Sequence, residues 1–261
     1  MASYYYLYDE STTYEFDSNA TTIDLGTPKR RFKVNSYAGS HGGIIRGMGH
    51  YDDRTIKVSM IFSNTTGNTT WNSTRNDFFE WINTANWDNL WFYIKHNDGT
   101  TITRTRCYPS PSSSEKYNYI KVSEAMTFEF LCPKPYFTNT TASTGTKAIA
   151  DSSEHSQAIT NNGNLETSIQ CKFTPTGTET LFQVELADDY GFRLEKYNFA
   201  AAEQIVYDTA DGSMTINSLS VNASQYLTAG TIFNLPIGAS TLYITCSGAG
   251  TFAWSFSERY I

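Results

Sequence analysis

The fold is decided by the stretch Leu90-Trp-Phe-Tyr-Ile94, then His96-Asn-Asp-Gly99, then Thr100-Ile-Thr-Arg-Thr-Arg-Cys-Tyr108. Two runs rich in aromatic and β-branched residues flank an Asp-Gly pair. This pattern is a strong short-range signal for a β-hairpin, because glycine accepts the positive φ that a tight turn requires. We therefore expect two antiparallel strands with Asp98 and Gly99 at their turn.

The rest of the N-terminal half adds further strands. Residues 30–37 and 54–62 alternate apolar and polar side chains, which predicts half-buried strands. Between them the glycine-rich segment 39–49 predicts bends or a close approach of the backbone. Residues 117–131 predict a long strand that ends before two prolines, since proline has no N–H to donate.

One segment of this half predicts a helix. It begins near Trp71 or Asn72, where Asn72 or Ser73 can act as the N-cap. Five apolar residues then follow at spacings of three and four: Phe78, Phe79, Trp81, Ile82 and Ala85. Such a stripe is expected to pack on a sheet.

The composition changes at residues 138–146, where small polar residues replace aromatic ones, and we place a module boundary at or just before this stretch. Beyond it, short strand-like segments recur between turn residues, at 165–173, 180–186, 191–194, 204–207, 213–219, 231–235, 241–246 and 251–256. This regular spacing is typical of an antiparallel sandwich or jelly roll. The fold class that we expect is therefore mainly β. The first module is expected to be a β-sandwich or barrel-like domain with one helix, and the second an antiparallel β-sandwich.

The overall composition excludes several classes of protein. The 261 residues carry a net charge of −7, and clustered Lys and Arg, which nucleic-acid binding requires, are limited to Lys29-Arg-Arg31 and Lys33. We interpret that run as a solvated strand end. No window approaches the roughly 20 apolar residues of a membrane span, and residues 1–8 do not resemble a signal peptide. We expect no membrane insertion, and folding in a cytoplasm.

Residues that could carry catalysis are sparse and isolated. His41, His50, His96 and His155 are the conventional bases present, and no serine lies in a G-x-S-x-G elbow. The adjacent pairs Asp52-Asp53 and Asp188-Asp189 would point to opposite faces of a strand, so turns explain them better than a glycosidase site. We therefore expect no catalytic residues, no cofactor-binding residues and no cofactor.

The cysteines predict neither a metal site nor a disulfide framework. Cys107, Cys132, Cys171 and Cys246 are far apart, with no C-x-x-C pair and no histidine at ligand spacing. We expect buried free thiols and no metal ligands.

Aromatic residues of the second module leave a carbohydrate-binding role open. Exposed aromatic rings next to Asn and Asp would suit sugar stacking, although on alternating strands most rings belong to the core. The candidates are Tyr190, Phe192, Tyr197, Phe199, Tyr207, Tyr226, Tyr243 and Trp254.

Several motifs of the first half resemble the distal tail proteins (Dit) of long-tailed, siphovirus-type bacteriophages. The matching stretches are Gly43-Ile-Ile-Arg-Gly-Met-Gly49 leading into Tyr51–Phe62, Asp77-Phe-Phe-Glu-Trp-Ile82, Leu90–Ile94, Arg106-Cys-Tyr108 and Thr127–Phe137. The second half is similar to the family's galectin-like domain through Asn161-Asn-Gly163, Ile232-Phe-Asn-Leu-Pro-Ile-Gly238 and Ser257-Glu-Arg-Tyr260. Residues 4–26 match this pattern only approximately.

The resemblance implies a particular organisation. Residues 1–137 would be a ring-forming tail-hub domain, 138–160 a connecting linker, and 161–261 a galectin-like β-sandwich. The ring, a hexamer in the family, would continue the tail tube and let DNA pass without binding it specifically. The sandwich would hold tail-associated lysin, fibre or receptor-binding proteins.

The resemblance also implies a location and a mode of action. The chain would be a virion component of the tail tip or baseplate, assembled in the cytoplasm of the host bacterium and taking part in host attachment. An acidic wall would let a polyanion slide, so the net charge suits such a channel. The alternatives are a carbohydrate-binding module or adhesin that uses the C-terminal sandwich, and a hydrolase.

Overall fold

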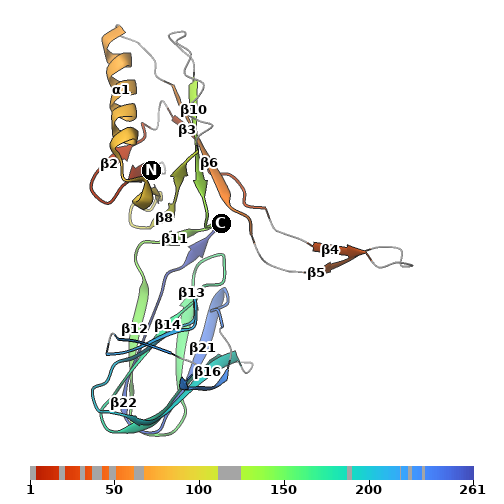
Figure 1. Cartoon of the computed structure of the whole chain (residues 1–261), viewed down its shortest axis with the longest axis vertical. Coiled ribbons are helices and arrows are strands. Elements are labelled where there is room, and N and C mark those ends of the chain that lie inside the picture. Colours follow the sequence, from red (N-terminus) through yellow and green to blue (C-terminus); the bar gives the residue numbers. More distant parts are fainter. Residues whose placement is uncertain are drawn as a thin grey trace. The chain divides into compact units, whose positions relative to one another are not determined.

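The computed structural model describes residues 4–17, 21–29, 33–36, 43–46, 51–61, 68–110, 125–186, 190–217, 219–222, 225–230 and 233–261. The chain divides into two compact units (Figure 1). The first unit comprises residues 1–138 with residue 261, and the second comprises residues 139–260. In the described part of the chain, no helix has the length and apolar character needed to cross a bilayer.

The described residues of the first unit form three antiparallel sheets. In the first sheet the strands are ordered β2 (Thr13–Glu15), β1 (Tyr4–Tyr8), β7 (Trp91–Lys95), β8 (Ile102–Arg106) and β11 (Phe137–Asn139). In the second sheet the order is β3 (Thr21–Asp24), β6 (Arg54–Ile61), β10 (Ala125–Cys132) and β9 (Tyr108–Pro109). The third sheet is the pair β4 (Lys33–Ser36) and β5 (Gly43–Arg46).

The β7–β8 hairpin has the turn that the sequence predicts. Trp91 pairs with Arg106 at one end and Lys95 with Ile102 at the other. Gly99 has a φ of 73°, and the Asp98 carboxylate accepts hydrogen bonds from the backbone N–H groups of Thr100 and Thr101, at 3.0 and 2.9 Å. The predicted roles of both turn residues are confirmed.

Helix α1 (Asn68–Thr84) packs against both of the larger sheets of this unit. The short 3-10 helix η1 (Trp87–Asn89) follows it in the chain. The Phe78 ring lies 4.9 Å from Tyr14 on β2 and 4.6 Å from Phe128 on β10, centroid to centroid. The predicted apolar stripe is therefore confirmed. The helix begins at Asn68, a few residues before the expected cap, because the Thr and Asn residues there carry no apolar period that would mark a helix.

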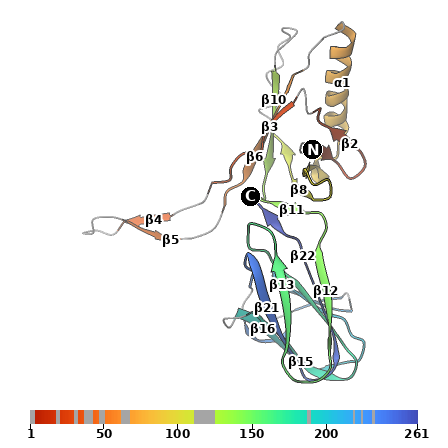
Figure 2. The ribbon, with the colours of Figure 1, turned by 180° about the vertical axis from the view of Figure 1, so that it is seen from behind.

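The second unit is a β-sandwich of two antiparallel sheets (Figure 2). The first sheet contains β12 (Ser143–Ile149), β22 (Gly250–Phe256), β14 (Gln170–Pro175), β17 (Ile205–Asp208), β18 (Ser213–Ile216) and β19 (Leu219–Val221). The second contains β13 (His155–Asn161), β21 (Gly238–Cys246), β15 (Glu179–Leu186), β16 (Tyr190–Phe199) and β20 (Leu227–Gly230). The last short strand is β23 (Arg259–Tyr260). Phe173 of the first sheet stacks on Phe182 of the second at 5.2 Å, in a core drawn wholly from this unit.

One glycine permits a close contact in this sandwich. Gly145 on the edge strand β12 lies opposite Trp254 of β22. A Cβ at position 145 would overlap the indole ring, so the ring can lie flat on the strand only because glycine is there.

Several expected boundaries differ from those observed. The segment 138–160, expected as a linker, contains strands β12 and β13. Both are edge strands, and their half-exposed Ser, Thr and Gly residues gave no hydrophobic signal. The glycine-rich segment 39–49 includes strand β5.

Three segments of the second unit were also placed inaccurately. The strand expected over 165–173 begins at Gln170, and the segment 213–219 divides into β18 and the start of β19. Within 231–235, the described residues 233–235 form no strand, and Leu235 makes a single bridge to Thr167. The expectations for Phe32, residues 117–124 and Asp188-Asp189 fall outside the described residues.

Candidate interaction surfaces

The outer face of the first sheet carries a row of aromatic and basic side chains. Residues alternate across the three central strands, so Leu7, Phe92 and Thr105 are buried on the inner side. The residues between them lie on the other side of the sheet: Tyr4, Tyr6 and Tyr8 from β1, Trp91, Tyr93 and Lys95 from β7, and Arg104 and Arg106 from β8. Lys95 is exposed, Tyr93 is buried, and the others are half-buried. We call this set the aromatic face.

The aromatic face is held rigid by contacts among its own side chains. Tyr6 and Tyr93 are paired across the strands and stack at 4.7 Å. The Arg104 guanidinium lies 4.4 Å from the centre of the Trp91 ring and donates a 3.0 Å hydrogen bond to the Tyr93 hydroxyl. Arg106 donates to the Asn89 side chain at 3.2 Å. Cation–π contacts of this kind stabilise by about 0.5–1 kcal/mol at exposed sites and fix the orientation of the guanidinium.

Burial affects the ionisation of the tyrosines on this face. Desolvation, with a hydrogen bond to Glu15 as the second cause, raises the pKa of Tyr4 to about 12. Desolvation and the neighbouring Tyr93 raise the pKa of Tyr6. Both rings are therefore neutral at physiological pH, and the charge of the aromatic face comes from its Lys and Arg residues.

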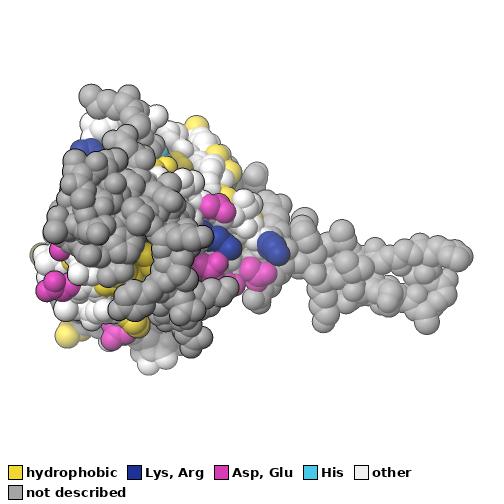
Figure 3. Space-filling model, turned by 90° about the horizontal axis from the view of Figure 1, so that it is seen from above, with side chains coloured by type: hydrophobic (Ala, Val, Ile, Leu, Met, Phe, Trp, Pro, Cys, Tyr) yellow, Lys and Arg dark blue, Asp and Glu magenta, His cyan; other side chains and the backbone are white. Residues whose placement is uncertain are grey.

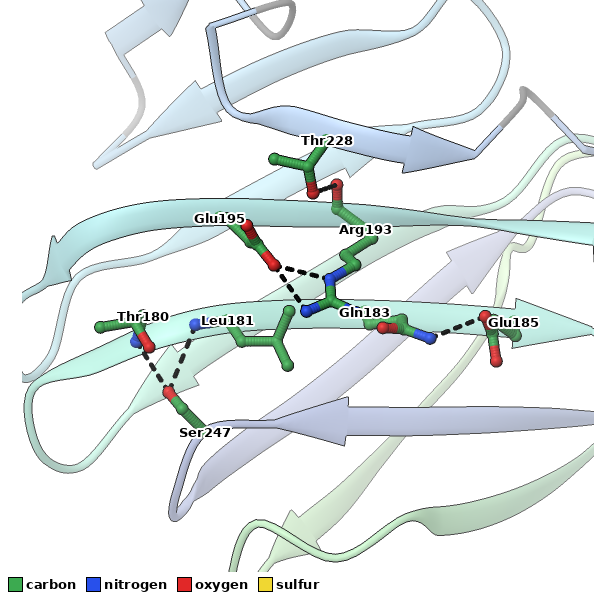
Figure 4. A network of polar contacts seen from close by, with 8 residues as sticks. All are labelled: Thr180, Leu181, Gln183, Glu185, Arg193, Glu195, Thr228 and Ser247. Atoms are coloured by element: carbon green, nitrogen blue, oxygen red, sulfur yellow. Dashed lines mark hydrogen bonds and ion pairs between the residues drawn. The ribbon is translucent and has the colours of Figure 1, made fainter.

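The second unit presents a polar outer face over β15 and β16 (Figure 4). Arg193 donates from Nε and Nη2 to one oxygen of Glu195, at 2.7 and 2.6 Å, and Gln183 donates to Glu185 at 2.6 Å. The Arg193–Glu195 pair is exposed, and exposed ion pairs contribute little to stability, about 0–1 kcal/mol. The shallow depression above them has a volume of about 590 Å³ and is lined by Thr180, Leu181, Arg193, Glu195, Lys196, Thr228 and Ser247.

One end of this depression is fixed by a β-bulge. The register of β15 shifts between Glu179 and Leu181. The Ser247 hydroxyl accepts hydrogen bonds from the backbone N–H groups of Thr180 and Leu181, at 2.7 and 3.2 Å, and donates to the buried Glu179 carboxylate at 2.6 Å. The polar groups at the bulge therefore satisfy one another, and the Ser247 hydroxyl is used to hold the bulge. Because its proton is donated to Glu179 and no histidine among the described residues is its partner, this serine does not have the arrangement of an activated nucleophile.

Among the residues that the structure describes, the candidate catalytic residues are not brought together. His96 shares a 3.0 Å hydrogen bond with Thr103 on the neighbouring strand, and His155 lies 3.3 Å from Asp151 near the surface. His41 and His50 lie outside the described residues. Across the described ranges, no three His, Cys, Asp or Glu side chains are grouped as a metal site would require.

All four cysteines are buried free thiols, as the sequence predicts. Desolvation raises the pKa of Cys132 and of Cys246 to about 12, and raises the pKa of Cys107 and Cys171 as well. The thiolate is the reactive form of cysteine, so these side chains are inert packing elements.

None of the described rings considered for sugar stacking is fully exposed. Phe192, Phe199 and Tyr207 are buried in the core, and Tyr226 and Trp254 are partly buried against it. The side chains of Tyr190 and Tyr197 are outside the described set. Tyr243 is half-buried and pairs with Glu185 of β15, on the side of the sheet away from the core residues Leu242 and Ile244. The described candidates therefore offer a glycan three half-buried rings, those of Tyr226, Tyr243 and Trp254.

The excess of acidic over basic residues lies entirely in the second unit. Residues 1–138 contain 14 Lys and Arg and 14 Asp and Glu, whereas residues 139–261 contain 5 and 12. Figure 3 shows acidic and basic side chains lying next to one another among the described residues on one face. One ion pair of the first unit joins Lys57 and Glu129, 2.9 Å apart. The net charge of −7 therefore does not describe the first unit, which is neutral.

The fold is that of a phage protein of known structure. The chain is similar to the crystal structure of the SPP1 Dit protein (gp 19.1), described as a paradigm of the hub adsorption apparatus in phages that infect Gram-positive bacteria. The match has a TM-score of 0.66 at 13% sequence identity and covers 98% of this chain and 99% of that chain. Both units of the chain are thus included, and the expected fold class is confirmed.

Other comparisons add less. A chain of the phage P2 baseplate, in its activated conformation with Ca, aligns over 99% of this chain and 98% of its own at 10% identity, with a TM-score of 0.40. A TM-score this low supports no argument about this chain. No protein-family model matches the sequence, and no curated protein matches it.

Proposed function

We propose that this chain is a structural protein of a phage tail tip, a baseplate hub of the distal-tail type that connects the tail tube to the adsorption apparatus. The observation that carries the proposal is the full-length fold match, because it spans both units in one alignment. A match to one sandwich alone would be weak support, since β-sandwiches serve many unrelated functions.

In this proposal the first unit closes into a ring, most simply a hexamer, that continues the tail tube. The second unit docks tail-associated lysin, fibre or receptor-binding proteins. The protein is then a virion component of the tail tip, assembled in the host cytoplasm. The first unit has equal numbers of basic and acidic residues, which supports a channel that neither holds nor strongly repels DNA. This proposal differs from the acidic channel wall that the net charge of the whole chain led us to expect.

The proposed action is binding and not catalysis. The isolated histidines, the inert thiols and the internally paired polar groups over β15 support it. The carbohydrate-binding alternative loses support because three of its aromatic candidates, Phe192, Phe199 and Tyr207, are buried in the core, so the hub role is the one proposed.

The test is the assembly state of the purified full-length chain at high concentration. Light scattering after size exclusion and negative-stain electron microscopy should show a six-membered ring with a central hole wide enough for duplex DNA. A compact two-fold dimer without a hole, or a chain that remains monomeric even when mixed with tail tubes, would contradict the proposal. A glycan array with the full chain gives the alternative its own readout, since a defined glycan ligand would favour an adhesin.

A further inference from the structure

The first unit has a second surface whose chemistry is opposite to that of the aromatic face. Asp77 and Glu80 are exposed on α1, and because they are three positions apart they share one side of the helix. The sequence from residue 76 to residue 84 contains these two acidic residues and no Lys or Arg. We call this pair the acidic helix side.

The two surfaces lie on different sides of the same unit. Helix α1 lies over the inner side of the first sheet, where Phe78 contacts Tyr14, and Tyr14 pairs with the buried Leu7. The exposed side of the helix therefore cannot share the outer face of that sheet. One unit thus presents an aromatic, basic surface in one direction and an acidic surface in another.

The aromatic face has the composition of a protein-binding surface. Tyr, Trp and Arg are the residues that most often dominate binding energy at interfaces, because they bury a large area with few rotatable bonds. Arg104 is already oriented by Trp91 and Tyr93, so little side-chain entropy is lost when a partner docks. The Nε of Arg106 is buried and has no hydrogen-bond partner among the described residues.

Charge decides which partner fits. The aromatic face carries the exposed Lys95 and the half-buried Arg104 and Arg106, and Glu15 on β2 is the acidic residue paired beside Tyr6. Two copies meeting face to face would place these cations against one another, which is unfavourable. The acidic helix side of another copy offers opposite charge and supplies the second, different patch that a head-to-tail ring requires.

We propose that the aromatic face of one copy docks on the acidic helix side of the next copy, in a head-to-tail contact between first units. This inference rests on the proposed function, because it names the contact that would close the ring. The ring could equally close through other surfaces, so the two proposals fail separately.

The test uses charge reversal in the full-length chain. Arg104→Glu and Glu80→Lys, each alone, should weaken assembly by about tenfold or more, because each places like charges across every contact. An equal mixture of the two variants should assemble again. If the two variants alternate around the ring, two kinds of contact occur. At one, the Glu introduced at position 104 meets the Lys introduced at position 80. At the other, the original Arg104 meets the original Glu80, so both contacts join opposite charges. The double variant should also assemble by itself.

Two further variants serve as matched controls. Lys134→Glu and Asp53→Lys reverse exposed charges of the same unit outside both surfaces. Each should assemble as the wild type does. If they weaken assembly as strongly as Arg104→Glu and Glu80→Lys, the effect comes from the overall charge of the unit and the proposed contact is wrong.

A cross-linking experiment covers the case in which Arg104→Glu fails to fold. Lys95 and Glu80 are both exposed, so Lys95→Cys and Glu80→Cys should be tolerated. The native thiols are buried and do not compete for a bismaleimide reagent. Mixing the two variants should give cross-linked pairs of one chain of each kind, whereas neither variant alone should cross-link.

The outcomes separate the two proposals. A wild-type ring with both single variants assembling normally, or with the mixture failing to assemble, would overturn the head-to-tail contact and leave the hub role standing. Loss of assembly with Arg104→Glu but not with Glu80→Lys would also overturn it, since the face would then bind something other than the helix. A wild-type chain that forms no ring, even when mixed with tail tubes, would overturn both.

Discussion

Asp9 is the residue that ties the start of the first sheet to the end of its helix. Its carboxylate is buried and accepts hydrogen bonds from the backbone N–H groups of Thr12 at 2.7 Å, Ser11 at 3.0 Å and Asn86 at 3.3 Å. Desolvation alone would raise the pKa of Asp9, but the hydrogen bonds from Thr12 and Ser11 outweigh it and lower the pKa from 3.8 to about 2. The ionised form is therefore the one that the fold stabilises.

Replacing Asp9 with Asn should lower the free energy of unfolding at pH 7 by about 1–2 kcal/mol, because the charge-assisted hydrogen bonds become neutral ones. A folded-state pKa below the unfolded value gives stability that is complete above about pH 4 and is lost as the pH falls toward 2. The difference between Asp9→Asn and the wild type should therefore shrink over that range. Urea unfolding at several pH values measures it, with Glu10→Gln as the exposed control. A constant difference down to about pH 2 would show that the charge is not involved.

The four thiols give a second prediction at the scale of single residues. Because burial raises their pKa values, fewer than one thiol per chain should react with Ellman's reagent within minutes under native conditions. All four should react once guanidinium unfolds the chain. Rapid native labelling would mean that the units open much more readily than their packing implies.

The elements show which parts of the fold the sequence could predict. The β7–β8 hairpin was predictable because Asp98 and Gly99 have turn chemistry that depends only on the local chain. The apolar stripe of α1 was predictable for the same reason, since the period of a helix is local. The edge strands β12 and β13 were missed because their pairing partners, β22 and β21, lie far along the chain.

The aromatic face shows the same limit. The pairing of Tyr93 with Arg104 follows from the predicted hairpin register, so half of the face could have been found from the sequence. The addition of Tyr6 depends on the pairing of β1 with β7, which are separated by most of the first unit. Local patterns cannot specify such a long-range contact, because non-local pairing depends on the packing of the whole sheet.

The contact between β12 and β22 supplies a prediction at the scale of elements. Gly145→Ala should reduce the stability of the second unit by about 1–3 kcal/mol, because a methyl group at this position forces Trp254 off the strand. Gly177→Ala is the matched control, since a Cβ there meets only Glu179 at an ordinary 3.6 Å. Denaturant unfolding compares the two variants. Equal stability would mean that the indole has room to move at no cost.

At the scale of the whole molecule, the two units differ in both charge and core. The hydrophobic core of the second unit is built from residues of that unit alone, from Ile149 to Phe256. A unit that contains its own core and its own complete sheets is expected to fold by itself.

A fragment from residue 139 to residue 261 should therefore be a folded, acidic β protein that unfolds cooperatively. Circular dichroism should show a β spectrum with a structured near-ultraviolet region, and calorimetry should show one transition. The fragment should bind strongly to an anion-exchange column, because it carries 5 basic and 12 acidic residues. A fragment with a flat near-ultraviolet spectrum would show that its packing needs the first unit.

The glycine beneath Trp254 also gives the molecule a built-in optical reporter. Of the five tryptophans, Trp254 is the single one after residue 138, and its indole is held partly buried against the sandwich core. Emission from an isolated second unit therefore comes from one fluorophore in one environment. If strand β12 loosens, the indole becomes more exposed to water, and the emission maximum should shift to longer wavelength before the rest of the unit unfolds.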